Sequence, residues 1–101
     1  MPKHVVNVGN VELISLNDNL PIRPPFVAFP HTTVEEWNEY PELMADHENA
    51  NHRWGSLAIR SSGKLIIVDT GMQGEGCYLL NDMKEKGVDR DAVDIVVFTH
   101  V

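Results

Sequence analysis

The sequence contains little cysteine, few basic residues and no long apolar run. Cys77 is the only cysteine among the 101 residues, which excludes an internal disulfide and a cysteine-rich zinc site and fits a reducing cytoplasm. No apolar run is longer than four residues, whereas a transmembrane helix needs about 20. The chain does not begin with the basic and apolar segments of a secretory signal. We therefore expect a cytoplasmic protein that does not span a membrane.

Acidic residues outnumber basic residues by 15 to 8, and the net charge is −7. Because a nucleic-acid backbone and an anionic membrane surface would both be repelled by this charge, the balance excludes them as partners. The composition, 43% hydrophobic and 23% charged, is typical of a soluble globular protein. A chain of this length makes one small domain.

The first half of the chain divides into a hairpin and a proline-rich segment. Residues 1–16 are predicted to contain a β-hairpin, because Gly9 and Asn10 make a two-residue turn between β-rich runs. Residues 17–53 contain prolines that favour an extended loop over a central strand. Thr33 and Glu36 have the spacing of a capping box for a short helix. We expect residues 17–53 to form a loop-helix insertion.

The insertion is also rich in acidic and aromatic side chains. Six acidic residues lie between positions 35 and 48, and two interpretations stay open: a solvated helical face, or a lid or partner surface. If the segment is a lid, three of its aromatic side chains are candidates to line a substrate pocket, namely Phe29, Trp37 and Tyr40. Histidines 4, 31, 47 and 52 are expected at the surface or in packing.

Residues 54–101 are predicted to form a β-β-α-β core. The runs Leu65–Val68 and Ile95–Phe98 are apolar without alternation, as in strands that are buried on both faces. An amphipathic helix is expected between them, at about residues 77–86. A helical crossover between two strands of one sheet makes them parallel. The sequence therefore predicts a mixed sheet in which these two runs are parallel neighbours.

Two side chains that could take part in catalysis or ligand binding follow the two apolar runs. Asp69 comes after the first run and His100 after the second. The carboxyl ends of parallel strands meet at the same edge of a sheet, where α/β proteins gather their functional groups. We therefore expect both side chains at this edge. Spacing alone leaves turn chemistry open for Asp69 and a structural role open for His100.

The same motifs resemble those of the metallo-β-lactamase-fold hydrolases. The match covers residues 54–101, in which Leu65–Val68 leads into Asp69-Thr70-Gly71 and, after a helix, Asp94–Phe98 leads into Thr99-His100. The proline-rich and acidic insertion looks most like the lactonase and organophosphate-hydrolase-like branch. The resemblance implies an α/β fold, the N-terminal half of an αβ/βα sandwich with a mixed sheet and flanking helices.

The resemblance also implies a metal site. The family motif is Thr-His-X-His-X-Asp-His, and the chain supplies its first part, Thr99-His100-Val101. His100 matches the first metal-binding histidine, and Asp69 matches an aspartate that orients the site without binding the ion. Two zinc ions are expected in the intact parent. Because a catalytic zinc needs about three protein ligands, the 101 residues alone are expected not to hold it. No other catalytic residue is assigned.

The function implied by the resemblance is hydrolysis. A metal-bound hydroxide would attack an ester, lactone or related bond of a small-molecule substrate. The alternative is a non-catalytic fragment or small binding module that pairs through an exposed sheet face. Half a sandwich leaves one apolar face of its sheet without a partner layer. The expected partners are therefore the remainder of the same fold or a second copy, which would make a homodimer.

Overall fold

A computed structural model describes residues 4–100 of the chain. Segment Leu20–Arg53 forms one compact unit, and the residues before and after it together form the other. Within the described residues, no helix has the length and apolar character needed to cross a membrane. The larger unit carries the candidate site.

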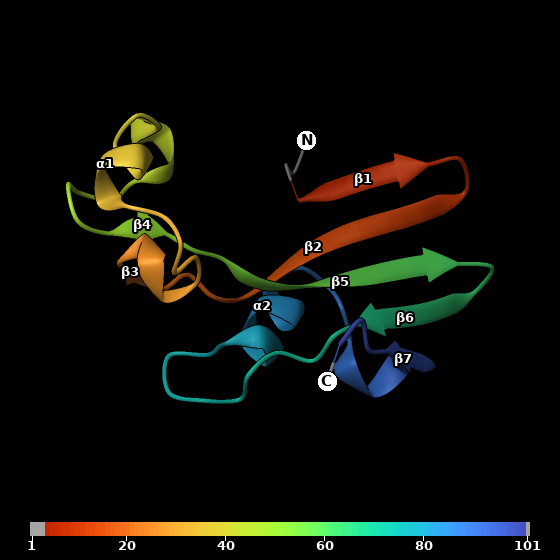
Figure 1. The fold of residues 1–101 in the computed structure, drawn as a ribbon. Helices are drawn as coiled ribbons and strands as arrows, with labels where there is room; N and C mark the ends of the chain where they lie inside the picture. Colours follow the sequence, from red (N-terminus) through yellow and green to blue (C-terminus); the bar gives the residue numbers. More distant parts are fainter. Residues whose placement is uncertain (1–3, 101) are drawn as a thin grey trace. The chain divides into compact units, whose positions relative to one another are not determined.

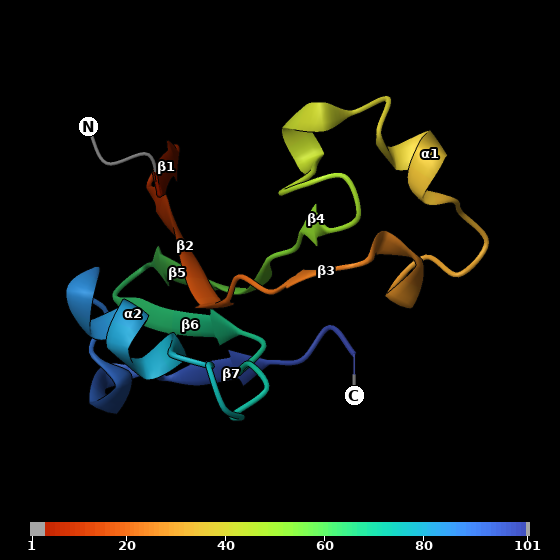
Figure 2. The ribbon, with the colours of Figure 1, turned by 90° about the vertical axis from the view of Figure 1, so that its left-hand side faces the viewer.

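The larger unit is built on a five-stranded mixed sheet with the order β1-β2-β5-β6-β7 (Figure 1). Its strands are β1 (Val5–Val8), β2 (Val11–Asn19), β5 (Trp54–Ser61), β6 (Lys64–Val68) and β7 (Ile95–Val97). Neighbours pair antiparallel except β6 and β7, which are parallel. The arrowheads of β6 and β7 point the same way in Figure 2. The predicted α/β mixed sheet with two parallel apolar runs is therefore confirmed.

Strand β2 is longer than the sequence predicts. The insertion was expected to begin at residue 17, but the strand continues to Asn19, which pairs with Trp54. The register shifts between Asn17 and Asn19, as at a β-bulge. Pro21 is the first proline of the segment. The residues before it all have a backbone N–H and can continue the strand pairing. The extra residues place Asp18 against the loop that follows β6.

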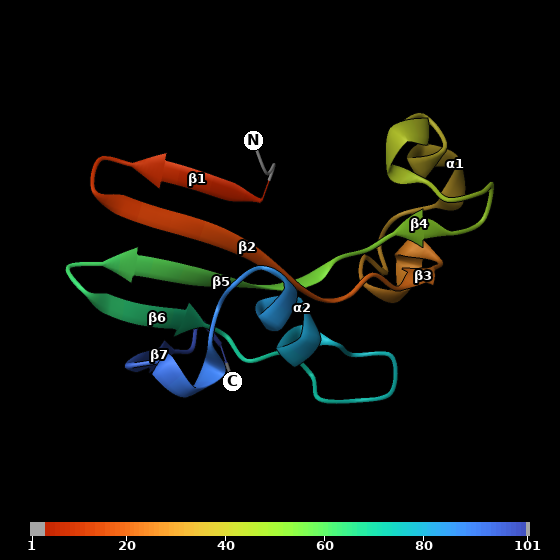
Figure 3. The ribbon, with the colours of Figure 1, turned by 180° about the vertical axis from the view of Figure 1, so that it is seen from behind.

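The core lies between the sheet and helix α2 (Leu79–Glu85). Figure 3 shows this helix on the face of the sheet turned away from the viewer in Figure 1. Alternate residues of the central strands point into this layer and meet apolar side chains from α2 and the turn after it. The buried cluster consists of Ile14, Leu16, Ala58, Leu65, Ile67, Leu79, Met83 and Val88. Burial of this apolar surface supplies most of the stabilisation of the unit.

Helix α2 is shorter than the predicted range of 77–86. Gly87 has φ +74° and ends the helix in the left-handed conformation. The Val88 N–H then donates to the Met83 carbonyl at 2.8 Å, which is the hydrogen bond of a Schellman cap. A short 3-10 helix, Arg90–Ala92, follows and leads into β7.

The two apolar runs are not buried on both faces, and this corrects the sequence-based expectation. Residues 65 and 67 are buried against α2, but residues 66 and 68 are only half-buried. Strand β7 is exposed, with Val97 at 45%, and Phe98 lies outside the strand at 63% exposure. The physical reason for β6 is that α2 covers the face on which residues 65 and 67 lie. Strand β7 is in addition the last strand of the sheet, with a strand neighbour on one side only.

An aligned row of apolar side chains crosses all five strands. The pairing register brings its members opposite one another: Val6, Leu13, Ile59, Ile66 and Ile95. Side chains alternate between the two faces of a strand, and the residues next to these in β2, β5 and β6 are the ones buried in the α2 layer. The apolar row therefore lies on the face opposite α2.

The smaller unit, Leu20–Arg53, has little regular structure. It contains strands β3 (Ile22–Arg23) and β4 (Ala50–Asn51), helix α1 (Val34–Trp37) and the 3-10 helices Pro25–Val27 and Pro41–Leu43. The predicted capping box is confirmed. The Glu36 N–H donates to Thr33 Oγ1 at 3.2 Å, and the Thr33 N–H donates to Glu36 Oε1 at 3.0 Å.

Candidate functional site

Asp69, Thr99 and His100 come together at the carboxyl ends of β6 and β7. The Asp69 N–H donates to the Val97 carbonyl at 2.8 Å, which extends the parallel pairing by one step. The Asp69 carboxylate then accepts twice from Thr99: from the amide at 2.9 Å and from the hydroxyl at 2.7 Å. The hydroxyl oxygen of Thr99 lies 2.8 Å from His100 Nδ1. Thr99 therefore connects the two side chains that the sequence analysis placed at this edge.

The hydrogen-bond chain determines which nitrogen of His100 carries a proton. Thr99 has one hydroxyl proton, and the carboxylate of Asp69 accepts it because an ionised carboxylate has no proton to give. The contact between Thr99 and His100 must then use the proton on Nδ1, which donates to the threonine oxygen. In the neutral ring, Nε2 keeps its lone pair. His100 is thus held in the form that can offer Nε2 to a cation.

The same contacts favour the ionised form of Asp69. The Thr99 hydroxyl and then the Thr99 amide lower the pKa of this carboxyl below its usual 3.8, and the charge of His100 acts in the same direction. Partial burial acts against them. Because the folded-state pKa is lowered, the stabilising contribution is present above the unfolded pKa. It is lost as the pH falls through the folded-state value.

The Thr99→Val variant is expected to raise the pKa of Asp69 toward 3.8, because it removes the strongest of these hydrogen bonds. A carbon-detected NMR titration of the Asp69 carboxyl measures the effect. Asp46 is the internal control, because its pKa is lowered by Asn49 and the Glu48 amide instead. Its titration should not change. An unaltered Asp69 midpoint in the variant would contradict the assigned hydrogen bonds.

Ser56 holds the backbone beneath Asp69. Asp69 has a φ of +65°, which is uncommon for a residue with a side chain. The buried Ser56 hydroxyl of β5 lies 2.7 Å from the Asp69 carbonyl oxygen and 2.8 Å from the Val68 carbonyl oxygen. One hydroxyl donor thus serves two successive carbonyl groups, which stabilises the turn at the end of β6.

Ser56→Ala is expected to lower the free energy of unfolding by about 1–3 kcal/mol, because it leaves these carbonyl groups without their donor. Ser56→Thr keeps the hydroxyl and should retain most of the stability. Urea unfolding measures both variants, with Ser61→Ala at the other end of β5 as the control. Equal midpoints for Ser56→Ala and the unaltered chain would show that the hydroxyl does not support the turn.

The described residues provide one candidate metal ligand at this edge, His100, and not a complete zinc site. Within residues 4–100 no three His, Cys, Asp or Glu side chains gather closely enough to hold one ion. His100 suits a zinc ligand because its Nε2 is available and its Nδ1 is fixed by a hydrogen bond, the arrangement found around metal-binding histidines. A catalytic zinc needs about two further protein ligands. The metal-binding role of His100 stays a prediction.

The predicted lid residues form a small aromatic cluster inside the smaller unit. The rings of Phe29 and Trp37 are 5.4 Å apart and tilted by 35°. The Trp37 indole N–H donates to Thr32 Oγ1 at 2.9 Å. Tyr40 is 53% exposed and lines a shallow depression together with Trp37 and Leu43. The cluster is consistent with packing within the unit, and its role as a lid stays a prediction.

Sequence reasoning missed the polar residues that support this edge, which are Ser56 and Asp18. Neither belongs to a recognisable motif, because each acts on a segment far along the chain. Ser56 is separated from Asp69 by a hairpin turn, and Asp18 from the loop after Asp69 by two strands and the insertion. For Asp18 the strand pattern offered a signal, because the residue continues the alternation of Ile14 and Leu16. For Ser56 it offered none, since the alternation of Leu57 and Ile59 predicts the opposite face as the core.

The fold of the chain was compared with known proteins. No family model and no curated protein matches the sequence. Solved structures do match. A dizinc quorum-quenching lactonase, AidC, gives a TM-score of 0.78 at 21% identity over 95% of this chain. The hydrolase AbOPH of the β-lactamase superfamily gives 0.76 at 19% over 96%. A probable metal-dependent hydrolase from Staphylococcus aureus gives 0.73 at 15% over 94%.

The match is extensive for this chain but partial for the others. It covers 35% of AidC, 35% of AbOPH and 39% of the Staphylococcus aureus protein. The aligned portion is therefore nearly the whole of this chain but less than two fifths of each solved protein. The chain has the fold of the metallo-β-lactamase-like hydrolases, over a little more than a third of their length.

Proposed function

We propose that this chain is the N-terminal part of a metal-dependent hydrolase that uses zinc and acts on a small-molecule ester, lactone or related substrate. The observation that carries the proposal is the hydrogen-bonded series Asp69–Thr99–His100 at the carboxyl ends of two parallel strands. In this role His100 binds the metal through Nε2, and Asp69 orients it through Thr99. Further ligands come from outside the described residues. We also propose a cytoplasmic location, from the single cysteine.

The solved neighbours support the substrate class and the metal. One of them is a dizinc lactonase in complex with a lactonase product, and the other two are hydrolases. A bound metal would supply Lewis-acid activation of the scissile bond. The contribution of the described residues is to hold the imidazole of His100 in a fixed orientation and to keep a carboxylate ionised behind it.

The proposal is tested by purifying the protein from its source and measuring its intact mass together with its metal content. A mass well above 11.4 kDa with bound zinc supports the hydrolase. A mass of 11.4 kDa without metal supports an inert chain instead. Candidate esters and lactones are then assayed with the metal-loaded protein and with the protein after chelation, and activity should be lost on chelation.

The exposed apolar row favours a second candidate function, pairing through the face of the sheet opposite α2. Three of its members, Leu13, Ile59 and Ile66, lie on central strands yet stay half-buried. Contiguous apolar surface of this kind marks an interaction site. The partner is the remainder of the fold or a second copy of the chain.

Sedimentation of the 101-residue chain is expected to show concentration-dependent dimers or larger species. Ile59→Lys combined with Ile66→Lys should shift the chain to monomer, because two charges would be placed in the contact. Leu80→Lys is the control, since Leu80 is exposed on α2 and outside the row. A monomeric unaltered chain, or a double variant that still associates, would contradict pairing through this face.

A further inference from the structure

The loop between β6 and α2 has a backbone that needs external support. Four of its residues have positive φ values: Asp69 at +65°, Gly71 at +78°, Gln73 at +56° and Gly76 at +78°. Two of them carry side chains, and such residues are held in the left-handed region only where their surroundings determine it. The loop begins at Asp69, so its shape determines where that carboxylate lies.

Asp18, near the end of β2, contacts both ends of this loop. The residue is buried, with 2% of its surface exposed. Oδ2 accepts from the Met72 N–H at 2.8 Å, and Oδ1 accepts from the Leu79 N–H at 3.3 Å. The Asp18 carbonyl also accepts from the Tyr78 N–H at 2.7 Å. One residue therefore supplies acceptors to the start of the loop and to the start of α2.

Gly71 lies directly against the Asp18 carboxylate. A Cβ atom at position 71 would lie 2.7 Å from Asp18 Cγ, and the positive φ would strain any side chain there as well. Gly71 is two residues from Asp69 in the chain. The Asp18 carboxylate is thus in contact with the loop immediately after the residue that binds Thr99.

We propose that Asp18 is a positioning residue of the candidate site: it fixes the loop that begins at Asp69, and through Asp69 it orients Thr99 and His100. The inference rests on the proposed function for its relevance to a metal site. Independently of any metal, the environment of His100 depends on a carboxylate of β2, which is the third strand from β7 in the sheet order. Removing Asp18 should therefore disturb both the loop and the side chains at the sheet edge.

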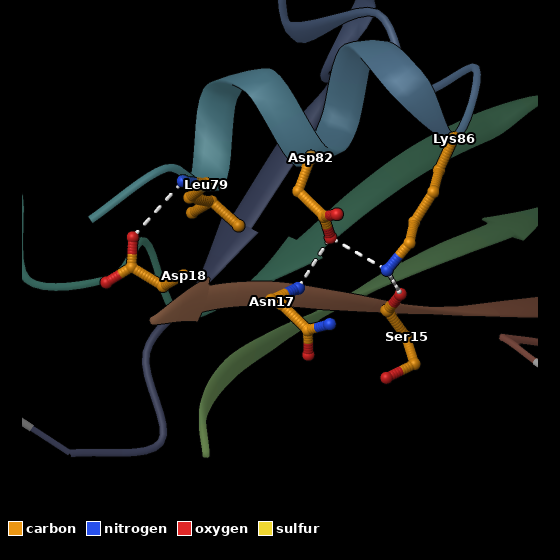
Figure 4. A network of polar contacts seen from close by, with 6 residues as sticks. All are labelled: Ser15, Asn17, Asp18, Leu79, Asp82 and Lys86. Atoms are coloured by element: carbon orange, nitrogen blue, oxygen red, sulfur yellow. Dashed lines mark hydrogen bonds and ion pairs between the residues drawn. The ribbon is translucent and has the colours of Figure 1, made fainter. Parts of the chain in front are cut away.

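Asp82 is a matched control for Asp18. It is also a buried carboxylate and also links β2 to α2, because it accepts from the Asn17 N–H at 2.6 Å and from Lys86 Nζ at 2.7 Å. Lys86 in turn donates to the Ser15 carbonyl at 2.9 Å. Figure 4 shows Asp18 bonded to Leu79 at the start of α2, and Asp82 bonded to Asn17 and to Lys86. Among the hydrogen bonds within residues 4–100, none joins the Asp82 carboxylate to the loop; its partners are Asn17 and Lys86.

The experiment compares Asp18→Ala and Asp18→Asn with Asp82→Ala by NMR of the 101-residue chain. Asp18→Ala should accelerate amide hydrogen exchange at Met72 and Leu79 at least tenfold relative to the Asp94 amide. It should also shift the Thr99 amide signal and abolish the preference of His100 for a proton on Nδ1, read from the ring nitrogen shifts. Asp18→Asn keeps one acceptor oxygen and should give smaller changes at the same residues.

The control and the milder variant make the outcomes decisive. Asp82→Ala should accelerate hydrogen exchange of the Asn17 amide and leave the NMR signals of Thr99 and His100 unchanged. The proposal is overturned if His100 shifts equally in Asp82→Ala, which would indicate general destabilisation. It is also overturned if amide exchange at Met72 and Leu79 accelerates while the Thr99 amide signal and the His100 ring nitrogen shifts do not change. If Asp18→Ala does not fold, Asp18→Asn decides by the same criteria.

Metal binding separates this proposal from the proposed function. In protein that carries a complete metal site, Asp18→Asn should weaken zinc binding about 10-fold to 100-fold, the usual effect of removing support behind a ligand. Asp82→Asn should leave it within about twofold. If the unaltered protein binds no zinc but Asp18 variants still disturb His100, the metal function fails and the positioning role stands. Undiminished zinc binding in Asp18→Asn would overturn the positioning role alone.

Discussion

Zinc titrated into the 101-residue chain is expected to bind more weakly than about 1 μM, and the chain is expected to hydrolyse neither esters nor lactones. Among residues 4–100, His100 is the one candidate ligand at the sheet edge, and a catalytic zinc needs about three protein ligands. A lone imidazole exchanges metal readily and does not fix the attacking group beside a substrate. Isothermal calorimetry and ester and lactone assays with added zinc measure the two effects.

The contrary result would be sub-micromolar binding with zinc-dependent turnover. Two copies of the chain could produce it by combining His100 and Asp69 from each, and turnover would then rise with the square of the chain concentration. In protein extended beyond Val101 to complete the motif, His100→Ala should abolish zinc at its site. His47→Ala is the control, because His47 is exposed in the smaller unit and outside the motif. Zinc should bind that variant normally.

Leu16→Ala is expected to lower the free energy of unfolding by about 2–5 kcal/mol. Leu16 is 0% exposed and lies in the cluster between β2 and α2, so truncation removes buried apolar area and leaves a cavity. Against a total stability of about 5–15 kcal/mol, this loss is a large share of the free energy of unfolding. Urea unfolding followed by circular dichroism measures it.

Leu80→Ala provides the comparison within the same apolar residue type. The amphipathic pattern predicts Leu80 on the apolar face of the helix together with Leu79, but the side chain is exposed on α2. Because it is exposed, its truncation should change the free energy of unfolding by no more than about 0.5 kcal/mol. A Leu16→Ala variant that unfolds at the same urea concentration as Leu80→Ala would show that the cluster under β2 is not the main source of stability.

Local chemistry was enough to predict several elements of the fold. The capping box of Thr33 and Glu36 formed because its two hydrogen bonds join residues three apart. Gly87 ended α2 because a left-handed residue is needed there. The parallel pairing of β6 and β7 followed from two apolar runs joined by a helix. In each case the determining groups are close in sequence or linked by one standard connection.

Burial and long-range polar contacts were harder to predict from the sequence. An apolar run indicates that a strand prefers to be buried. The exposure of that strand in the fold depends on which elements pack beside it, and β7 has only β6 as a strand neighbour. The placement of Asp69 and His100 at one edge followed from topology. The support that Asp18 and Ser56 give to that edge did not, because it depends on the register across three strands and on a bulge in β2.

The pairing of Asn19 with Trp54 closes a long excursion of the chain. The entropic cost of closing a loop grows only with the logarithm of its length, by about 0.6 kcal/mol for each doubling. Once β2 and β5 are paired, the sheet is therefore almost indifferent to how many residues lie between Leu20 and Arg53. Segments of different length and composition can be exchanged at this point while the strands and the edge that carries His100 keep their register.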